Sequence, residues 1–267
     1  MGRRSGYRAS WGGVLLAAAL FCLTACADQE YSLPAVPHLV RECRLSVDQA
    51  GRLAGRWPSL PVPVALKNGD FSADETRAIV AALEVWNSFA RQSWGKKVFD
   101  YGDSAGPRLA ESSVPAKLCG QPIVQGDGYS GAVVIHKQRR WPHPDRSAIA
   151  LTSYCPAPGS PLPRYYAAII EVNFEHFFAP GRQQPDLASI LLHELGHVLG
   201  LDHSCDSADR RGSPACVGYR RTPGQTAAVM FAEFHFDRLG YGETRLALNA
   251  DDQSRANCLY SSLSPFQ

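Results

Sequence analysis

The chain has 267 residues and a formal net charge of +2, with 45% hydrophobic and 19% charged residues. These values are typical of a folded globular domain and exclude a fibre, a disordered chain or a mostly membrane-embedded protein. We find no internal repeat and no clustered basic run of the kind that nucleic-acid binding needs, so no nucleic-acid partner is expected.

Residues 1–25 are interpreted as a lipoprotein signal peptide. Three arginines precede an apolar run over residues 14–23, which is too short for a permanent membrane span. Residues 23–26, Leu-Thr-Ala-Cys, resemble the lipobox of bacterial lipoprotein signal peptides, in which the cysteine receives a lipid. Cys26 is therefore the predicted lipidation site. The alternatives are a plain secretory signal and a twin-arginine signal.

Residues 26–56 are predicted to be a tether, because a proline-containing stretch at 32–37 has no helical or strand period. The folded domain is predicted over residues 57–267. Six cysteines remain after Cys26, and an even number in an exported chain indicates disulfides. They are Cys43, Cys119, Cys155, Cys205, Cys216 and Cys258. Loop closure favours Cys205 with Cys216. The other four stay open, with Cys43–Cys258 and Cys119–Cys155 as the pairing considered.

Strands and helices are mixed along the domain, which predicts an α+β or α/β fold. The strands are expected at residues 62–66, 98–101, 132–136, 148–153 and 167–174. A helix is expected from Ser72, which forms a capping box with Glu75, to Gly95. Asp186 is a suitable cap for a second helix, and residues 250–260 predict a third.

The candidate metal-binding and catalytic residues lie in residues 193–203, His-Glu-Leu-Gly-His-Val-Leu-Gly-Leu-Asp-His. Residues four apart share one face of a helix, so His193 and His197 can direct ring nitrogens at one ion. Glu194 would lie beside that ion. A left-handed glycine commonly follows a helix, so Gly200 predicts a turn that brings His203 from another direction. Each residue alone has an ordinary structural explanation, but together they indicate a catalytic zinc with three protein ligands.

This segment resembles the metzincin signature His-Glu-x-x-His-x-x-Gly-x-x-His. In that family a methionine turn lies beneath the ligands, and Met230 is the one methionine besides the first residue. Ser204, directly after the third histidine, and the segment 248–260 make the chain most similar to the matrixin branch, including its bacterial members. The resemblance implies a twisted five-stranded mixed sheet, an active-site helix, the methionine turn and a C-terminal helix.

The resemblance further implies a zinc-dependent endopeptidase with Glu194 as general base and one catalytic Zn²⁺. Its substrate would be a protein or peptide aligned along the strand at 148–153, in a pocket walled by residues 204–230. Calcium or a second zinc is common in matrixins, but no residues are assigned to either, because His136, His143 and His176 are scattered along the chain. The protein is expected to be a monomer in the cell envelope, anchored to the membrane through Cys26 outside the cytoplasm, or else secreted.

Two other functions are kept open. The first is a surface lipoprotein that only binds a partner through this fold, and the second is a zinc hydrolase of a different kind. Retention of Glu194 and of all three histidines argues against the first. The spacing of His203 argues against a gluzincin, in which a distant glutamate would be the third ligand.

Overall fold

The computed structural model describes residues 55–103, 106–110, 133–157, 164–205 and 223–261. All of them belong to one compact unit, residues 36–267. Within the described ranges, no helix is long and apolar enough to cross a membrane.

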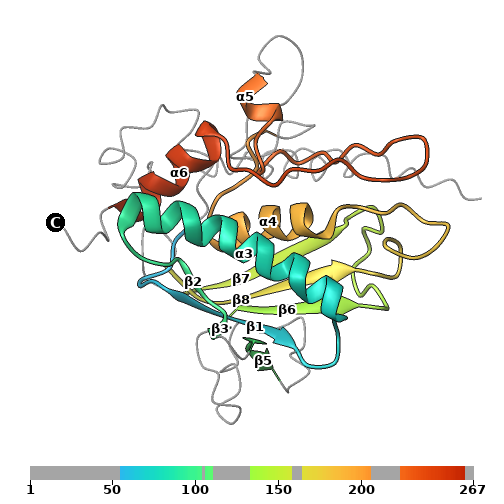
Figure 1. Cartoon of the computed structure of the whole chain (residues 1–267), viewed down its shortest axis with the longest axis horizontal. Helices are drawn as coiled ribbons and strands as arrows, with labels where there is room; N and C mark the ends of the chain where they lie inside the picture. Colours follow the sequence, from blue (N-terminus) through green and yellow to red (C-terminus); the bar gives the residue numbers. More distant parts are fainter. Residues whose placement is uncertain (1–54, 104–105, 111–132, 158–163, 206–222, 262–267) are drawn as a thin grey trace, which may run out of the picture. The chain divides into compact units, whose positions relative to one another are not determined.

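A mixed sheet of six strands forms one layer of the described part of the chain, and the helices lie on one side of it (Figure 1). Its order is β2-β1-β6-β8-β7, and β5 also pairs with β1. The strands are β1 Val62–Lys67, β2 Phe99–Asp100, β5 Leu109–Ala110, β6 Val133–Gln138, β7 Ala150–Ala157 and β8 Arg164–Asn173. The pairs β1–β6 and β6–β8 are parallel, whereas β7 is antiparallel to β8.

The five predicted strands are all present, and the sheet has one strand more than predicted. The additional strand, β5, has two residues, which is too short to show a period in sequence. The same reason applies to β3 (Gly102–Asp103) and β4 (Gly106–Pro107), which form a small separate ribbon. A fold of helices on a mixed sheet is confirmed.

The helices begin and end at local signals. Helix α3 (Ala73–Trp94) starts with the predicted capping box, in which the Ser72 amide donates to Glu75 Oε2 (2.8 Å) and the Glu75 amide donates to Ser72 Oγ (3.3 Å). It ends at Gly95, whose φ is 70°. Helix α4 (Leu187–Val198) starts at the predicted cap Asp186. A short helix, α5 (Pro223–Thr226), precedes α6 (Ala250–Tyr260), which has the predicted bounds.

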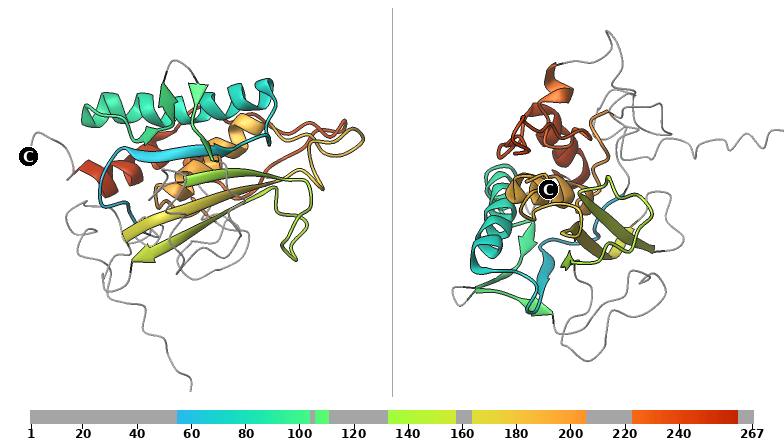
Figure 2. Two further views of the ribbon diagram at one scale, coloured as in Figure 1. Left: turned by 90° about the horizontal axis from the view of Figure 1, so that it is seen from below. Right: turned by 90° about the vertical axis from the view of Figure 1, so that its right-hand side faces the viewer.

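Helices α3 and α4 cover the same face of the sheet (Figure 2). Alternate strand residues therefore separate into a set that packs with the helices and a set on the opposite face. The first includes Val64, Ile135 and Ile170, and the second Ala65, Val134 and Ile169. Helix α4 contacts both α3 and β7. The Trp86 indole of α3 donates to the Leu192 carbonyl (3.0 Å), which fixes α4 against its neighbour.

Candidate metal centre

Helix α4 presents two histidines from consecutive turns. The Asp186 side chain accepts from the Ser189 amide (2.8 Å) and so fixes the first turn. His193 and His197 follow on one face, with ring centroids 4.7 Å apart. Both rings lie on the same face of α4, where the side chain of a third residue could approach them.

The chain reverses after α4 in a turn that needs glycine. Leu199 is the C-cap, and Gly200 follows with a φ of 94°. The Gly200 amide donates to His197 O (2.8 Å) and the Leu201 amide to Gly196 O (3.0 Å), the two bonds of a Schellman motif. A Cβ on Gly200 would also lie 2.0 Å from the Gly55 carbonyl oxygen. Backbone conformation and close packing therefore both require glycine here.

This reversal brings His203 beside the helical pair. Its ring centroid lies 4.8 Å from that of His197 and 5.2 Å from that of His193. One ring nitrogen from each histidine lies within 4.8 Å of the others, and the Nε2 atoms of His197 and His203 are 3.2 Å apart. The structure thus brings together the three histidines of the predicted set.

The opposite ring nitrogens are held by backbone carbonyls. His193 Nδ1 lies 2.8 Å from Val229 O, and His197 Nδ1 lies 2.8 Å from Leu201 O. A carbonyl only accepts, so each Nδ1 carries the proton and each Nε2 keeps its lone pair. Burial, and then the two neighbouring histidines, hold the pKa of His193 well below its ordinary value. These features fit a metal, because a neutral imidazole is the ligating form.

Glu194 is buried beside the histidines. The residue is 6% exposed, and Thr152 Oγ1 of β7 donates to its Oε2 (2.6 Å). Burial raises the pKa of Glu194 to about 7, although the Thr152 hydrogen bond acts in the opposite direction. The sequence did not single out Thr152, since no local pattern connects it with a residue 42 positions away.

Met230 packs directly beneath α4 and is fully buried. A Cβ on Gly196 would lie 2.2 Å from Met230 Sδ, so this helical glycine makes room for the methionine. The Val229 carbonyl that accepts from His193 belongs to the same turn. Gly196 was not selected from the sequence. A glycine inside a helix costs stability and usually has a packing reason, which was the available signal.

A family model matches this region of the chain. The matrixin model covers residues 67–209, which is more than half of the sequence and includes the whole 193–203 segment. The chain belongs to the matrixin family. Matrixins are zinc-dependent metallopeptidases, and the protein is a hydrolase of that kind. No curated protein matches the chain significantly.

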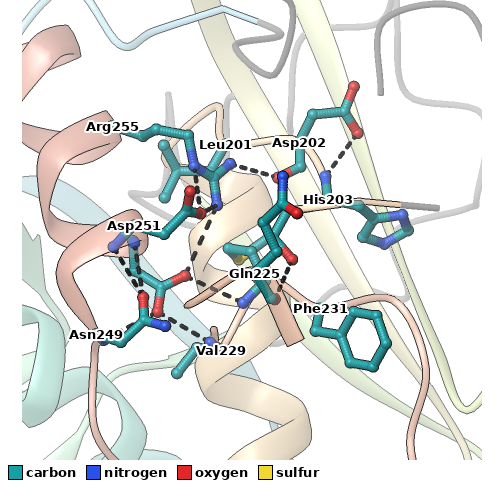
Figure 3. Close-up of polar contacts among 12 residues, drawn as sticks. Leu201, Asp202, His203, Gln225, Val229, Phe231, Asn249, Asp251 and Arg255 are labelled. Atoms are coloured by element: carbon teal, nitrogen blue, oxygen red, sulfur yellow. Dashed lines mark hydrogen bonds and ion pairs between the residues drawn. The ribbon is translucent and has the colours of Figure 1, made fainter. Parts of the chain in front are cut away.

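Helix α6 contacts both the methionine turn and the segment before His203 (Figure 3). Asp252 is fully buried and accepts from the amides of Val229 (2.9 Å) and Met230 (3.2 Å). Arg255 Nη1 donates to the Asp202 carbonyl (2.7 Å), as Figure 3 shows. Neither role was predicted, because only the position of α6 in the fold creates these contacts.

A cavity of about 510 Å³ adjoins the histidines. On one side it is lined by β7 and the residues before it, and on the other by Ala232, Glu233 and Phe234. This wall follows Met230 and lies just beyond the predicted stretch 204–230. Of that stretch, residues 206–222 lie outside the described ranges.

The other histidines do not join a metal-binding group in the described residues. His143 Nε2 instead lies 2.8 Å from Glu171 Oε2. His136 is buried, and the His176 amide donates to Asn173 Oδ1. Cys155, Cys205 and Cys258 are disulfide-bonded. The remaining predicted cysteines, Cys26, Cys43, Cys119 and Cys216, lie outside the described residues.

Proposed function

We propose that the protein is a zinc-dependent endopeptidase, with His193, His197 and His203 holding the metal and Glu194 acting as general base. The observation that carries this proposal is the convergence of three histidine nitrogens beside a buried carboxylate. Three protein ligands leave one position of a tetrahedral zinc for water or substrate, which is the arrangement of catalytic rather than structural sites.

Zinc, when bound, supplies a Lewis acid that activates water and polarises the scissile carbonyl. Glu194 takes a proton from the attacking water and later delivers it to the leaving amine. A pKa of about 7 suits transfer in both directions near neutral pH. The hydrogen bond from Thr152 holds one carboxylate oxygen and leaves the other available for the water.

Strand β7 is suited to align an extended substrate. Among the described strands it pairs with β8 alone, so its other side faces the cavity. A peptide can add to such an edge through main-chain hydrogen bonds. The cavity lining extends along the chain on both sides of Thr152, from Ser147 to Tyr154. A substrate can therefore continue in both directions past Glu194, which favours cleavage within polypeptides.

Glu194→Gln tests the mechanism because it keeps the shape of the side chain and removes the base. We expect cleavage of a denatured protein substrate to fall by at least about 100-fold, with zinc content unchanged. Glu84→Gln is the matched control, since Glu84 lies on the outer side of α3 and contacts Arg91 and Tyr101 instead. If Glu194→Gln cleaved the substrate at the wild-type rate, Glu194 would not be the general base. Absence of chelator-sensitive cleavage in the zinc-loaded wild type would favour a protein that only binds a partner.

We also propose that the protein acts at the cell envelope, anchored through a lipid on Cys26. The proposal is supported by the lipobox-like sequence at residues 23–26. Replacing Cys26 by alanine should move the protein from the membrane to the soluble fraction and abolish incorporation of a labelled fatty acid. Membrane retention of Cys26→Ala would refute the anchor.

A further inference from the structure

Arg255 is a fully buried arginine on α6 that links this helix to the segment carrying the third histidine. Its Nε donates to Asp251 Oδ2 (3.0 Å), one turn earlier on the same helix. Its Nη2 lies 2.8 Å from the same oxygen and 3.7 Å from Asp252 Oδ1. Its Nη1 crosses to the Asp202 carbonyl oxygen (2.7 Å). The two carboxylates therefore orient the guanidinium, and the carbonyl takes the remaining direction.

The hydrogen bond from Arg255 to the Asp202 carbonyl fixes the orientation of the whole peptide unit between Asp202 and His203. The Asp202 C=O and the His203 N–H belong to one planar peptide unit. Arg255 holds its oxygen, and Asp202 Oδ1 accepts from its N–H (3.0 Å). Both ends of the peptide plane are thus fixed. Because the His203 Cα lies in this plane, its position is fixed as well (Figure 3).

The third histidine needs such a support more than the other two. His193 and His197 are carried by α4, whose backbone is fixed by its own hydrogen bonds. His203 follows a reversal at Gly200, outside any helix. Helix α6 holds this reversal at two places, because Tyr260 Oη also donates to the Leu199 carbonyl (2.7 Å). A charged donor makes the stronger of these two bonds, since hydrogen bonds from ionised groups exceed neutral ones.

We propose that Arg255 is a positioning residue for the third metal ligand: it fixes the peptide plane before His203 and thereby tightens the binding of zinc. This inference rests on the proposed zinc site. Groups that orient metal ligands without touching the metal typically contribute about 10–100-fold to metal affinity.

Two substitutions of Arg255 and one control separate positioning from stability. Arg255→Lys keeps a positive charge for Asp251, but one ammonium cannot reproduce the planar fork that reaches both Asp251 and Asp202. Arg255→Ala removes the charge that faces the fully buried carboxylate of Asp252 and the partly buried one of Asp251, so it can fail to fold. Asn257→Ala is the control, since the Asn257 side chain on the same helix accepts from Trp94 of α3 (2.8 Å) and so links α6 to α3 rather than to the histidine segment.

The measurement is the zinc dissociation constant, obtained by competition with a chromophoric chelator, beside the melting temperature of the metal-free protein. We expect Arg255→Lys to weaken zinc binding by about 10–100-fold. Asn257→Ala should lower the melting temperature and leave the zinc dissociation constant within about twofold. In the zinc-loaded enzyme, Arg255→Lys should lower kcat and leave KM near the wild-type value, because the cavity wall is not altered.

Zinc binding by Arg255→Lys within twofold of the wild type would overturn the proposal, whatever the melting temperature. Equal losses of zinc affinity in Arg255→Lys and Asn257→Ala would also overturn it, because they would assign the effect to the docking of α6. A wild-type protein that binds no zinc would instead refute the proposed function.

Discussion

Replacing Gly196 by alanine is expected to destabilise the protein, although alanine is the better helix former. In an ordinary helix this change stabilises by about 1 kcal/mol. Here the new Cβ would lie 2.2 Å from Met230 Sδ and 3.3 Å from Trp86 Cζ2. Normal contacts between such atoms begin at about 3.5 Å, so Met230 would have to move by more than about 1 Å. Both neighbours are fully buried, which leaves little room for that shift.

The expected magnitude follows from two opposing contributions. Forcing an extra methyl group into a packed core costs about 1–3 kcal/mol, against a helix-propensity gain of about 1 kcal/mol. We therefore expect Gly196→Ala to lower the free energy of unfolding by up to about 2 kcal/mol. In a Met230→Ala background the space is free, so the same substitution should become neutral or stabilising.

Urea unfolding of the four proteins of this double-mutant cycle, in the presence of a chelator, measures the coupling between the two residues. The chelator removes any contribution from bound zinc. The coupling free energy should be about 1–3 kcal/mol, far above the additivity limit of about 0.5 kcal/mol. A Gly196→Ala protein that is more stable than the wild type, or an effect equal in both backgrounds, would refute the packing of Met230 against α4.

Gly200→Ala should destabilise the protein more than Gly196→Ala, because the new Cβ would lie 2.0 Å from the Gly55 carbonyl oxygen and the alanine would have to adopt a positive φ. A melting curve that matches the wild type would contradict this. Thr152→Val should lower kcat/KM by about 10–100-fold, the equivalent of one hydrogen bond to a charged group, whereas Thr152→Ser keeps the hydroxyl and should retain most activity. In the metal-free protein, burial raises the pKa of Glu194 from 4.5 to about 7. Folding therefore takes up a proton between these values, and the free energy of unfolding contributed by Glu194 should fall by about 3 kcal/mol as the pH rises from 4.5 to 7. Glu194→Gln should lack this component in chelator-treated urea titrations, and identical pH profiles would disprove the shift.

The sequence by itself determined the elements and the spacing of the metal-site residues. The capping box at Ser72, the cap at Asp186 and the bounds of α6 are local signals, because each depends on hydrogen bonds between residues two to four positions apart. The i, i+4 relation of His193 and His197 is equally local. Strands of two residues were missed, since so short a segment has no period to detect.

Only the tertiary structure decided what surrounds these residues. The hydroxyl that binds Glu194 comes from Thr152, and the carbonyl that binds His193 comes from Val229. The guanidinium that binds the Asp202 carbonyl, next to His203, comes from Arg255. These partners lie 42, 36 and 53 positions from the residues that they hold. The sheet register and the packing of α6 bring them together, and neither is expressed in any short stretch of sequence. A helix period specifies which face a ligand occupies, but the groups that orient it depend on where distant backbone is packed.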